Sequence, residues 1–183
     1  MKVKIKNVFE NIEELKAAAD KGKVKEGDEL ITKDYDGKCR YIIIKTGEEI
    51  HMVRKYLLSE DRPMRRDGFN LQEWLKDDYK ESLKSDLRKL LLKEPFLLSE
   101  KEVFGENDAS DDEEGEQYEY FKKCKNRIAT YKKDDAYSRY WWHRSVGSSA
   151  CFAIVNNNGN ANNNDASDAN GVRPALIISV ENA

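Results

Sequence analysis

The stretch that decides the fold runs from residue 140 to residue 180 and reads YWWHRSVGSSACFAIVNNNGNANNNDASDANGVRPALIISV. It opens on three aromatic residues, and apolar runs follow at 150–155 and 175–178. Turns are expected at 156–159 and before Gly171, because Asn and Gly tolerate positive φ. We therefore predict four short strands joined by turns in an antiparallel sheet, with a polar strand at 160–165.

Charge and amide residues are distributed in opposite ways along the 183-residue chain. Of its 32 Lys and Arg and 35 Asp and Glu residues, only five lie from residue 141 onward, while eight of the fifteen residues at 156–170 are Asn. The length suits one domain, or one domain with a small appendage. The sequence thus predicts a charged body that carries a nearly uncharged, amide-rich C-terminal segment.

Several classes of protein are excluded by composition. No apolar run approaches the 18 residues of a membrane span, and residues 1–10 lack the apolar core of a secretory signal, so we expect synthesis in the cytoplasm and no membrane insertion. The net charge of −3, with Lys and Glu intermixed, argues against a nucleic-acid partner. Three scattered cysteines predict neither a disulfide framework nor a metal site.

The first 65 residues predict a small helical and β-rich unit. Alternating charged and apolar residues indicate strands at 2–8, 29–33, 39–45 and 49–53, with hairpin turns at 36–37 and 46–47. Asn11 and Glu14 form a capping-box pattern for a helix that Gly22 would end.

The middle of the chain predicts further helices. Asn70 with Glu73 repeats the capping pattern, and leucines spaced by a helical period predict a helix over 82–93. A short strand is expected at 96–98, then a brief helix capped by Ser99 and Glu102, and another helix at 117–126. Between the last two, seven acids in residues 106–116 match no calcium-loop motif and predict a solvated, mobile loop.

The Asn-rich tract admits three interpretations. Low-complexity disorder is the compositional default, but the tract is short and lies between two predicted apolar strands. A stacked Asn ladder would need a fixed repeat, which is absent. A recognition surface is the third, because an amide side chain offers two donors and an acceptor on a short stem. We favour a polar, uncharged surface for a protein or sugar ligand.

The same residues resemble a bacterial and phage family. The strings YWWHRSVGSS at 140–149, FAIV at 152–155 and NGVRPAL at 170–176 are similar to the family's Trp-x-Arg-Ser opening and its Gly-Val-Arg-Pro-Ala close. Residues 96–105 look like the segment before this module in gut-phage members. The family has the C-type-lectin fold, is related to formylglycine-generating-enzyme-like domains, and includes variable proteins of diversity-generating retroelements.

This resemblance implies an α+β, C-type-lectin-like fold with short antiparallel strands, two or more helices and a variable C-terminal sheet. Such retroelements mutate template adenines, and Asn codons begin with two adenines, so the Asn-rich tract resembles a variable region near its template state. The resemblance covers about residues 70–180, and we expect a ligand-binding domain at 66–183 preceded by an extension at 1–65, either packed on it or serving attachment.

The resemblance also assigns roles to individual residues. Scaffold roles are implied for Trp141, Trp142, Arg144, Ser145, Gly159, Gly171, Val172, Arg173 and Pro174. Ligand-binding, variable roles are expected for His143, Ser148, Ala150, Cys151, Ile154, Asn156, Asn158, Asn160, Asn162, Asn163, Asn164, Asp165 and Asp168. Strand alternation lets only about half of the latter point outward, and Cys151 and Ile154 could equally be core.

The expected function is therefore non-enzymatic recognition of a protein or glycan on a host or target cell, without cofactor, metal or catalytic residue. Display on a virion or in a homo-oligomer would supply avidity. The alternatives are a structural virion or cell-surface interaction module without diversification, and, less favoured, an enzyme of the formylglycine-generating type. That enzyme would need paired cysteines, and Cys124 and Cys151 are the only conceivable pair in this half.

Overall fold

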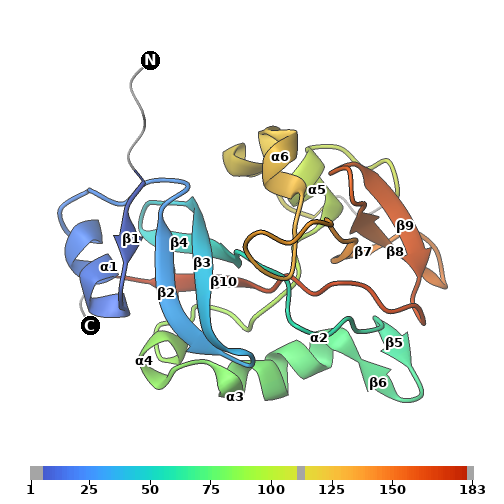
Figure 1. The fold of residues 1–183 in the computed structure, drawn as a ribbon, viewed down its shortest axis with the longest axis horizontal. Coiled ribbons are helices and arrows are strands. Elements are labelled where there is room, and N and C mark those ends of the chain that lie inside the picture. The colour runs from blue at the N-terminus through green and yellow to red at the C-terminus, as the bar shows by residue number, and fades with distance from the viewer. Residues whose placement is uncertain (1–5, 111–113, 181–183) are drawn as a thin grey trace.

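The protein has an α+β architecture with two main sheets. The structure is a computed structural model that describes residues 6–110 and 114–180. In this part of the chain, a five-stranded sheet and a three-stranded sheet lie side by side, with α1 at the outer edge of the larger one (Figure 1). Helices α2 to α4 lie along one side of the two sheets, and α5 and α6 lie on the other side (Figure 1).

The larger sheet is built mainly from the first third of the sequence. In spatial order its strands are β1 (Val8–Phe9), β2 (Glu29–Asp34), β3 (Gly37–Lys45), β4 (Glu49–Arg54) and β10 (Ala175–Ser179). The predicted strands at 29–33, 39–45 and 49–53 are confirmed, as is the turn at Gly37, whose φ is +87°. The predicted strand at 2–8 falls mostly outside the described residues; β1 covers only its end.

Capping residues fix the helix starts as the sequence predicts. Asn11 precedes α1 (Ile12–Ala19), and its side-chain oxygen accepts from the Glu14 N–H at 2.9 Å. Asn70 caps α2 (Leu71–Trp74) in the same way. Ser99 and Glu102 form the predicted capping box of α5 (Glu100–Phe104), which ends at Gly105 in the left-handed region.

The C-terminal strand joins the larger sheet. β10 pairs antiparallel with β4, with Ala175 opposite Val53 and Ser179 opposite Glu49. The first 65 residues and the end of the chain therefore share one sheet, so the segment at 1–65 is packed against the segment at 66–183. The predicted four-stranded C-terminal sheet is wrong in its last strand. β10 forms its backbone hydrogen bonds with β4 of the larger sheet, where most of its apolar side chains are buried.

The smaller sheet comes from the segment that opened the sequence analysis. Its strands are β7 (Trp141–Val146), β8 (Cys151–Val155) and β9 (Ala161–Asp165), in that spatial order. Both pairs are antiparallel, with Phe152 opposite Asn164 and Ile154 opposite Asn162. The polar strand β9 is thus the edge of the sheet, and β8 is its centre.

The helix predicted over 82–93 is broken. Only α3 (Lys80–Ser82) and α4 (Ser85–Arg88) form, because Leu83 is extended with ψ of 142°. Residues 90–92 then pair with β10: the Ser179 N–H donates to the Leu90 carbonyl, and the Leu92 N–H donates to the Ile177 carbonyl, both at 2.9 Å. Completing the hydrogen bonds of β10 overrides the helical pattern of the leucines.

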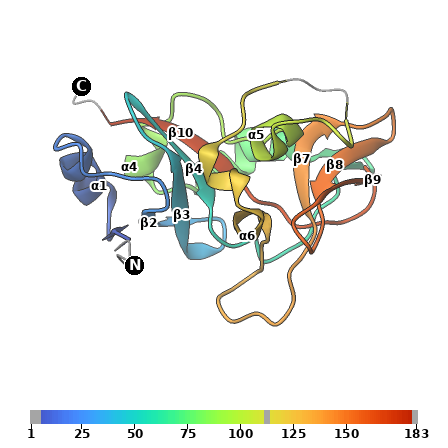
Figure 2. The ribbon, with the colours of Figure 1, turned by 90° about the horizontal axis from the view of Figure 1, so that it is seen from above.

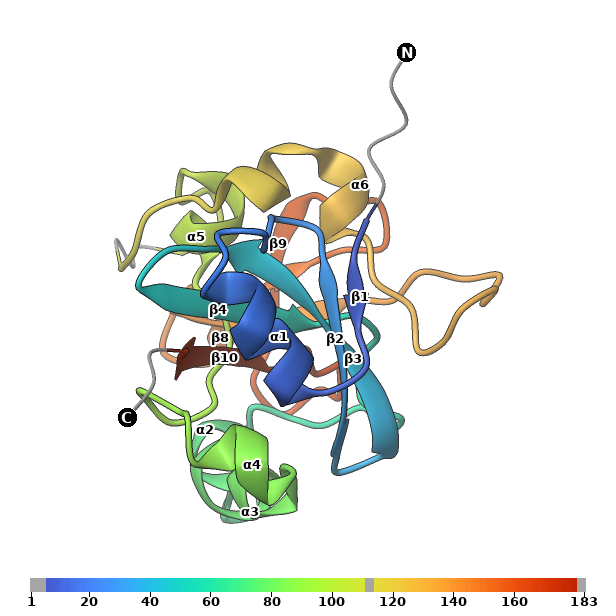
Figure 3. The same cartoon turned by 90° about the vertical axis from the view of Figure 1, so that its left-hand side faces the viewer.

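Other predicted elements are shortened for similar reasons. The strand expected at 96–98 is a single bridge between Phe96 and Ala175, and the helix expected at 117–126 divides at Lys123. The remaining elements are β5 (Arg65–Arg66), β6 (Phe69–Asn70), a π-helical turn (Leu75–Tyr79), a 3-10 turn (Glu119–Lys122) and α6 (Cys124–Arg127). Between α6 and β7, the chain projects from the body as a long loop (Figures 2 and 3).

The apolar core continues from one sheet to the other. Trp142 and Phe152 belong to a cluster with the leucines of α2 to α4, and Trp141 and Val155 belong to a second cluster with α5 and the 3-10 turn. Both faces of β7 and β8 are therefore covered by protein. No helix within the described residues has the length and apolar character needed to cross a membrane.

The shared sheet predicts cooperative unfolding. Leu176 in β10 is fully buried, so Leu176→Ala should lower the free energy of unfolding by about 2–5 kcal/mol. The matched change Leu92→Ala, at a half-exposed leucine, should cost less than about 0.5 kcal/mol. Urea unfolding followed by far-UV circular dichroism and by tryptophan fluorescence measures both; two separate transitions would contradict the single unit.

Candidate ligand-binding surface

A buried arginine holds the two sheets together. The Arg173 side chain donates from Nε to the Arg54 carbonyl at 3.0 Å and from Nη1 to the Asn126 carbonyl at 3.2 Å. Its guanidinium lies 5.1 Å from the Trp141 ring and 5.6 Å from the Phe121 ring. Burial lowers the pKa of Arg173 to about 10, so it stays charged at neutral pH. Strand β4, helix α6 and β7 thus meet on one side chain.

The paired tryptophans fix the small sheet from both faces. Trp141 and Trp142 are fully buried and alternate across β7. The Trp141 indole N–H donates to the Arg127 carbonyl at 2.8 Å, and the Trp142 indole N–H donates to the Arg62 carbonyl at 2.7 Å. Each ring therefore anchors one connecting segment to the sheet.

Arg144 and Ser145 tie β7 to α5. Arg144 donates from Nη1 to the Leu97 carbonyl at 2.8 Å and to the Glu102 carboxylate at 2.6 Å. The Ser145 hydroxyl accepts from the Glu100 N–H at 2.9 Å. Burial alone would lower the pKa of Arg144, but the neighbouring carboxylates raise it above its ordinary value. The motif residues thus bond to backbone and to the start of α5.

Two glycines allow close packing next to the tract. A Cβ on Gly171 would lie 2.5 Å from Leu57 Cδ1 and 2.8 Å from the Tyr140 carbonyl oxygen. Gly159 has φ of +81°, and a Cβ there would lie 2.9 Å from Cys124 Sγ. Val172 and Pro174, which flank Arg173 in the sequence, are also buried. All nine residues expected to be scaffold are therefore packed or bonded.

Most residues expected to bind ligand lie on the surface. The exposed ones are Ser148, Ala150, Asn158, Asn160, Asn162, Asn163, Asp165 and Asp168. The partly exposed ones are Cys151, Asn156 and Asn164. They come from the β7–β8 turn, the β8–β9 turn, β9 and the segment after it. We call this set the amide surface.

Two backbone N–H groups of the edge strand β9 are hydrogen-bonded by side chains of the same strand. The Asn156 N–H donates to the Asn160 carbonyl, and this register turns the N–H groups of Asn163 and Asp165 away from β8. These two groups donate instead to the side-chain oxygens of the preceding residues, Asn162 at 2.8 Å and Asn164 at 3.0 Å. The amide oxygens thus block edge pairing; the Asn164 NH₂ group donates to Asn170 Oδ1 at 3.5 Å, and the Asn162 side chain is exposed to solvent.

The β8–β9 turn is held from both sides. Asn156 Oδ1 accepts from the N–H groups of Asn158 at 2.9 Å and Asn160 at 3.1 Å. The Ser138 hydroxyl donates to the Asn157 carbonyl at 2.6 Å, and the Cys124 thiol lies 3.3 Å from the Asn158 carbonyl oxygen. The turn therefore has a fixed backbone under exposed side chains.

Two of the expected ligand-binding residues are inside the protein. Ile154 is 1% exposed in the centre of the small sheet, and His143 is fully buried between Trp141 and Phe104, with ring centroids 4.9 and 5.8 Å away. Their assignment to the ligand surface is wrong, because both faces of β7 and β8 are covered. Within the described part of the chain, neither ring nitrogen of His143 has a hydrogen-bond partner.

Sequence reasoning missed an aromatic loop beside the amide surface. Tyr137 is 71% exposed and Tyr140 is 43% exposed. Together with Arg139 and Asn157 they line a cleft of about 420 Å³. Tyr and Arg are frequent anchors in binding sites, so the string YSRY at 137–140 was the available signal.

Neither a metal centre nor a cysteine pair is evident in the described residues. The three cysteines are free thiols, and no group of His, Cys, Asp or Glu among residues 6–110 and 114–180 is arranged to hold a metal ion.

The predicted solvated loop at 106–116 is anchored at its start. The Glu100 carboxylate accepts from the N–H groups of Asp108 and Ala109 and from the Ser110 hydroxyl. Its residues 111–113 lie outside the described part.

The comparisons with known proteins add one match. Residues 90–180, just under half of the chain, match the model of DUF6273, a domain of unknown function. This match spans the motif residues and the amide surface, and it ends one residue after β10. No curated protein and no solved structure matches the chain.

The buried His143 predicts acid sensitivity. Burial, and then the charges of Arg144 and Arg173, lower the pKa of His143 to about 3. The unfolded chain binds this proton near pH 6.5 and the folded chain does not, so stability falls with pH below about 6.5, by about 1.4 kcal/mol per unit. His143→Leu should remove this slope between pH 6.5 and 5, measured by urea unfolding.

His51→Gln is the comparison variant, because burial also lowers the pKa of the buried His51 and this second histidine can carry part of the pH dependence. An unchanged slope in His143→Leu would show that His143 does not carry this pH dependence.

Proposed function

We propose that this protein is a non-enzymatic ligand-binding protein that recognises its target with the amide surface. The observation that carries the proposal is the separation of the C-terminal segment into a buried frame and exposed amides. Trp141, Trp142 and Arg173 are at most 2% exposed, whereas most Asn side chains of the tract reach solvent. Side chains on such a frame can change without disturbing the packing beneath them.

The amide surface has the chemistry of a recognition site. The side-chain oxygens of Asn156, Asn162 and Asn164 accept backbone N–H groups of β9 and the β8–β9 turn, so these side chains lose little further conformational entropy on binding. The NH₂ groups then offer donors to hydroxyl or carbonyl oxygens of a ligand. Tyr137 and Tyr140, beside the turn, supply apolar contact area. A protein or a glycan on a host or target cell fits this combination.

We infer further that the fold is C-type-lectin-like. The antiparallel pair of β4 and β10, which brings early and late parts of the chain together, supports this inference. So does the separate small sheet that carries the two tryptophans. The resemblance of residues 140–176 to retroelement variable proteins leads us to propose that the Asn-rich tract is a diversified region.

The main rival is a structural virion or cell-surface interaction module with a merely solvated polar edge. The hydrogen bonds from β9 backbone N–H groups to β9 side chains favour this rival, because blocking an exposed edge is sufficient reason for polar residues there. The exposed tyrosines at the same place favour recognition, since blocking an edge does not require them. An enzyme of the formylglycine-generating type is less favoured, since its cysteine pair is not evident.

The proposal predicts that the amide surface determines ligand choice and not folding. The triple variant Asn158→Ser, Asn160→Ser, Asn163→Ser should keep its melting temperature within about 3 °C, because all three side chains are exposed. Its binding to an array of bacterial surface glycans and proteins should differ from that of the natural chain. The array and a thermal melt are the two measurements.

The matched control makes three substitutions by serine at exposed sites elsewhere: Lys21→Ser, Lys23→Ser and Lys89→Ser. This control should bind as the natural chain does. Equal binding by the two triple variants would contradict recognition by the amide surface. The gene neighbourhood tests diversification separately: a reverse-transcriptase gene with a near-copy of this segment that differs at adenines is expected, and a lone gene would count against it.

A further inference from the structure

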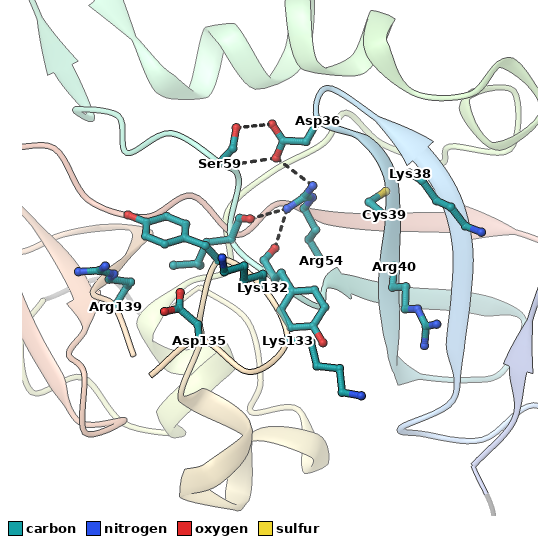
Figure 4. A pocket seen from close by; sticks show the side chains of 13 residues that line it. Asp36, Lys38, Cys39, Arg40, Arg54, Ser59, Lys132, Lys133, Asp135 and Arg139 are labelled. Carbon is teal, nitrogen blue, oxygen red and sulfur yellow. Dashed lines mark hydrogen bonds and ion pairs between the residues drawn. The ribbon is translucent and has the colours of Figure 1, made fainter. Parts of the chain in front are cut away.

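A second cleft, which shares Arg139 with the cleft beside the amide surface, has a basic lining. It has a volume of about 630 Å³ and opens between β3 and the projecting loop before β7. Figure 4 shows Lys38 and Arg40 on β3 at one side and Lys132, Lys133 and Arg139 of the loop at the other. The volume is within the range of small-ligand pockets. We call this the basic cleft.

Most of the positive charge in the basic cleft is not neutralised. Among the described residues, Lys38, Lys132 and Lys133 have exposed side chains with no ion pair or side-chain hydrogen bond. Arg40 shares the Glu29 carboxylate with Lys6 and Lys55, so three cations surround one buried acid. The whole chain carries a net charge of −3, so the cleft reverses the overall sign.

The two carboxylates that line the basic cleft do not cancel this charge. Asp36 accepts from Arg54 Nη2 at 3.0 Å and from the Ser59 hydroxyl at 2.7 Å, so it is already bound. This leaves Asp135 to balance the five cations on the two sides of the cleft, Lys38, Arg40, Lys132, Lys133 and Arg139. An anion that enters the cleft therefore meets an excess of donors with positive charge.

The floor of the basic cleft is rigid. Arg54 is buried and donates to the Asp34 carboxylate at 2.7 Å and to the Leu57 carbonyl at 2.5 Å. Asp34 also accepts from the Tyr79 hydroxyl at 2.7 Å. Burial alone would raise the pKa of Asp34, but Arg54 lowers it below its ordinary value. The basic side chains of the cleft thus lie above a network of hydrogen-bonded buried residues.

We propose that the basic cleft binds an acidic oligosaccharide, one that carries carboxylate or sulfate groups on successive sugars. Cations on two opposite walls suit several separated anionic groups better than a single one. Tyr56 and Tyr131 also line the cleft. The Tyr131 hydroxyl donates to Asp61, and Arg139 lies 5.1 Å from the Tyr131 ring centre, so this aromatic side chain holds a lining cation in place. Arg139 lines both this cleft and the cleft beside the amide turn, so a chain of sugars can extend from one to the other.

The surroundings favour an acidic oligosaccharide over a nucleic acid. Asp61 lines the neighbouring cleft and Glu60 is next to it in the sequence, so acids bound the basic region on that side. A nucleic acid binds through a basic track that runs along many phosphates. The cations here line one cleft of about 630 Å³, which suits a short oligosaccharide.

Binding to defined probes tests the proposal with the full chain. The probes are an oligogalacturonate for carboxylate, a heparin-derived oligosaccharide for sulfate, a neutral malto-oligosaccharide and an oligo(dT) of similar length. Calorimetry should detect binding of one or both acidic oligosaccharides, weakened by added salt, and none of the neutral one. The double variant Lys132→Glu, Lys133→Glu should weaken that binding about tenfold or more, because it places like charge in the cleft.

The matched control is Lys21→Glu, Lys23→Glu, which makes the same change of charge at exposed lysines outside the cleft. Circular dichroism checks that both variants fold, and Lys38→Glu provides a second test from the opposite wall. Binding that is lost in the cleft variants and kept in the control supports the site. Absence of binding to both acidic oligosaccharides, equal losses in the control, or tighter binding of oligo(dT) would overturn it. The amide surface is unchanged in these variants, so the proposed function stands or falls independently.

Discussion

The buried guanidinium of Arg173 is the interaction on which the arrangement of the molecule depends. It lies where β4, α6 and β7 meet, donates to the carbonyls of Arg54 and Asn126, and stacks near the Trp141 ring. A buried charge without a carboxylate partner is tolerated only when backbone oxygens and aromatic faces surround it. Arg173 thereby sets the position of the small sheet relative to the large one. A shorter or neutral side chain could not donate hydrogen bonds to both carbonyl oxygens.

From this junction follows the division between frame and surface. The tryptophans on β7 fill the space on both faces of the small sheet, so β8 becomes a central strand that is apolar at nearly every position. β9 is left as the edge, with solvent on its outer side, and its asparagines cover the edge N–H groups with their own oxygens. The amide-rich composition is therefore consistent with two demands, edge protection and recognition, that the same side chains can meet together.

Local patterns in the sequence predicted local structure well, and pairing over long distances poorly. Caps at Asn11, Asn70 and Ser99 and the hairpin at Gly37 depend on neighbouring residues, so they could be found without the fold. The leucines at 83–91 have a helical period, but their backbone completes β10, which is about 90 residues away. In the site, the exposure of the amides followed from their chemistry. The burial of His143 did not, because it depends on what covers β7.

The central claim is that the amide surface can vary while the frame cannot. Its most direct test is a pair of libraries displayed on yeast and selected by resistance to protease, one randomised at Asn158, Asn160, Asn162 and Asn163, and one at Trp141, Trp142, Phe152 and Arg173. We expect most members of the first library to remain as resistant as the natural chain and nearly all members of the second to lose resistance. Similar losses in the two libraries would contradict the account, because the asparagines would then be structural.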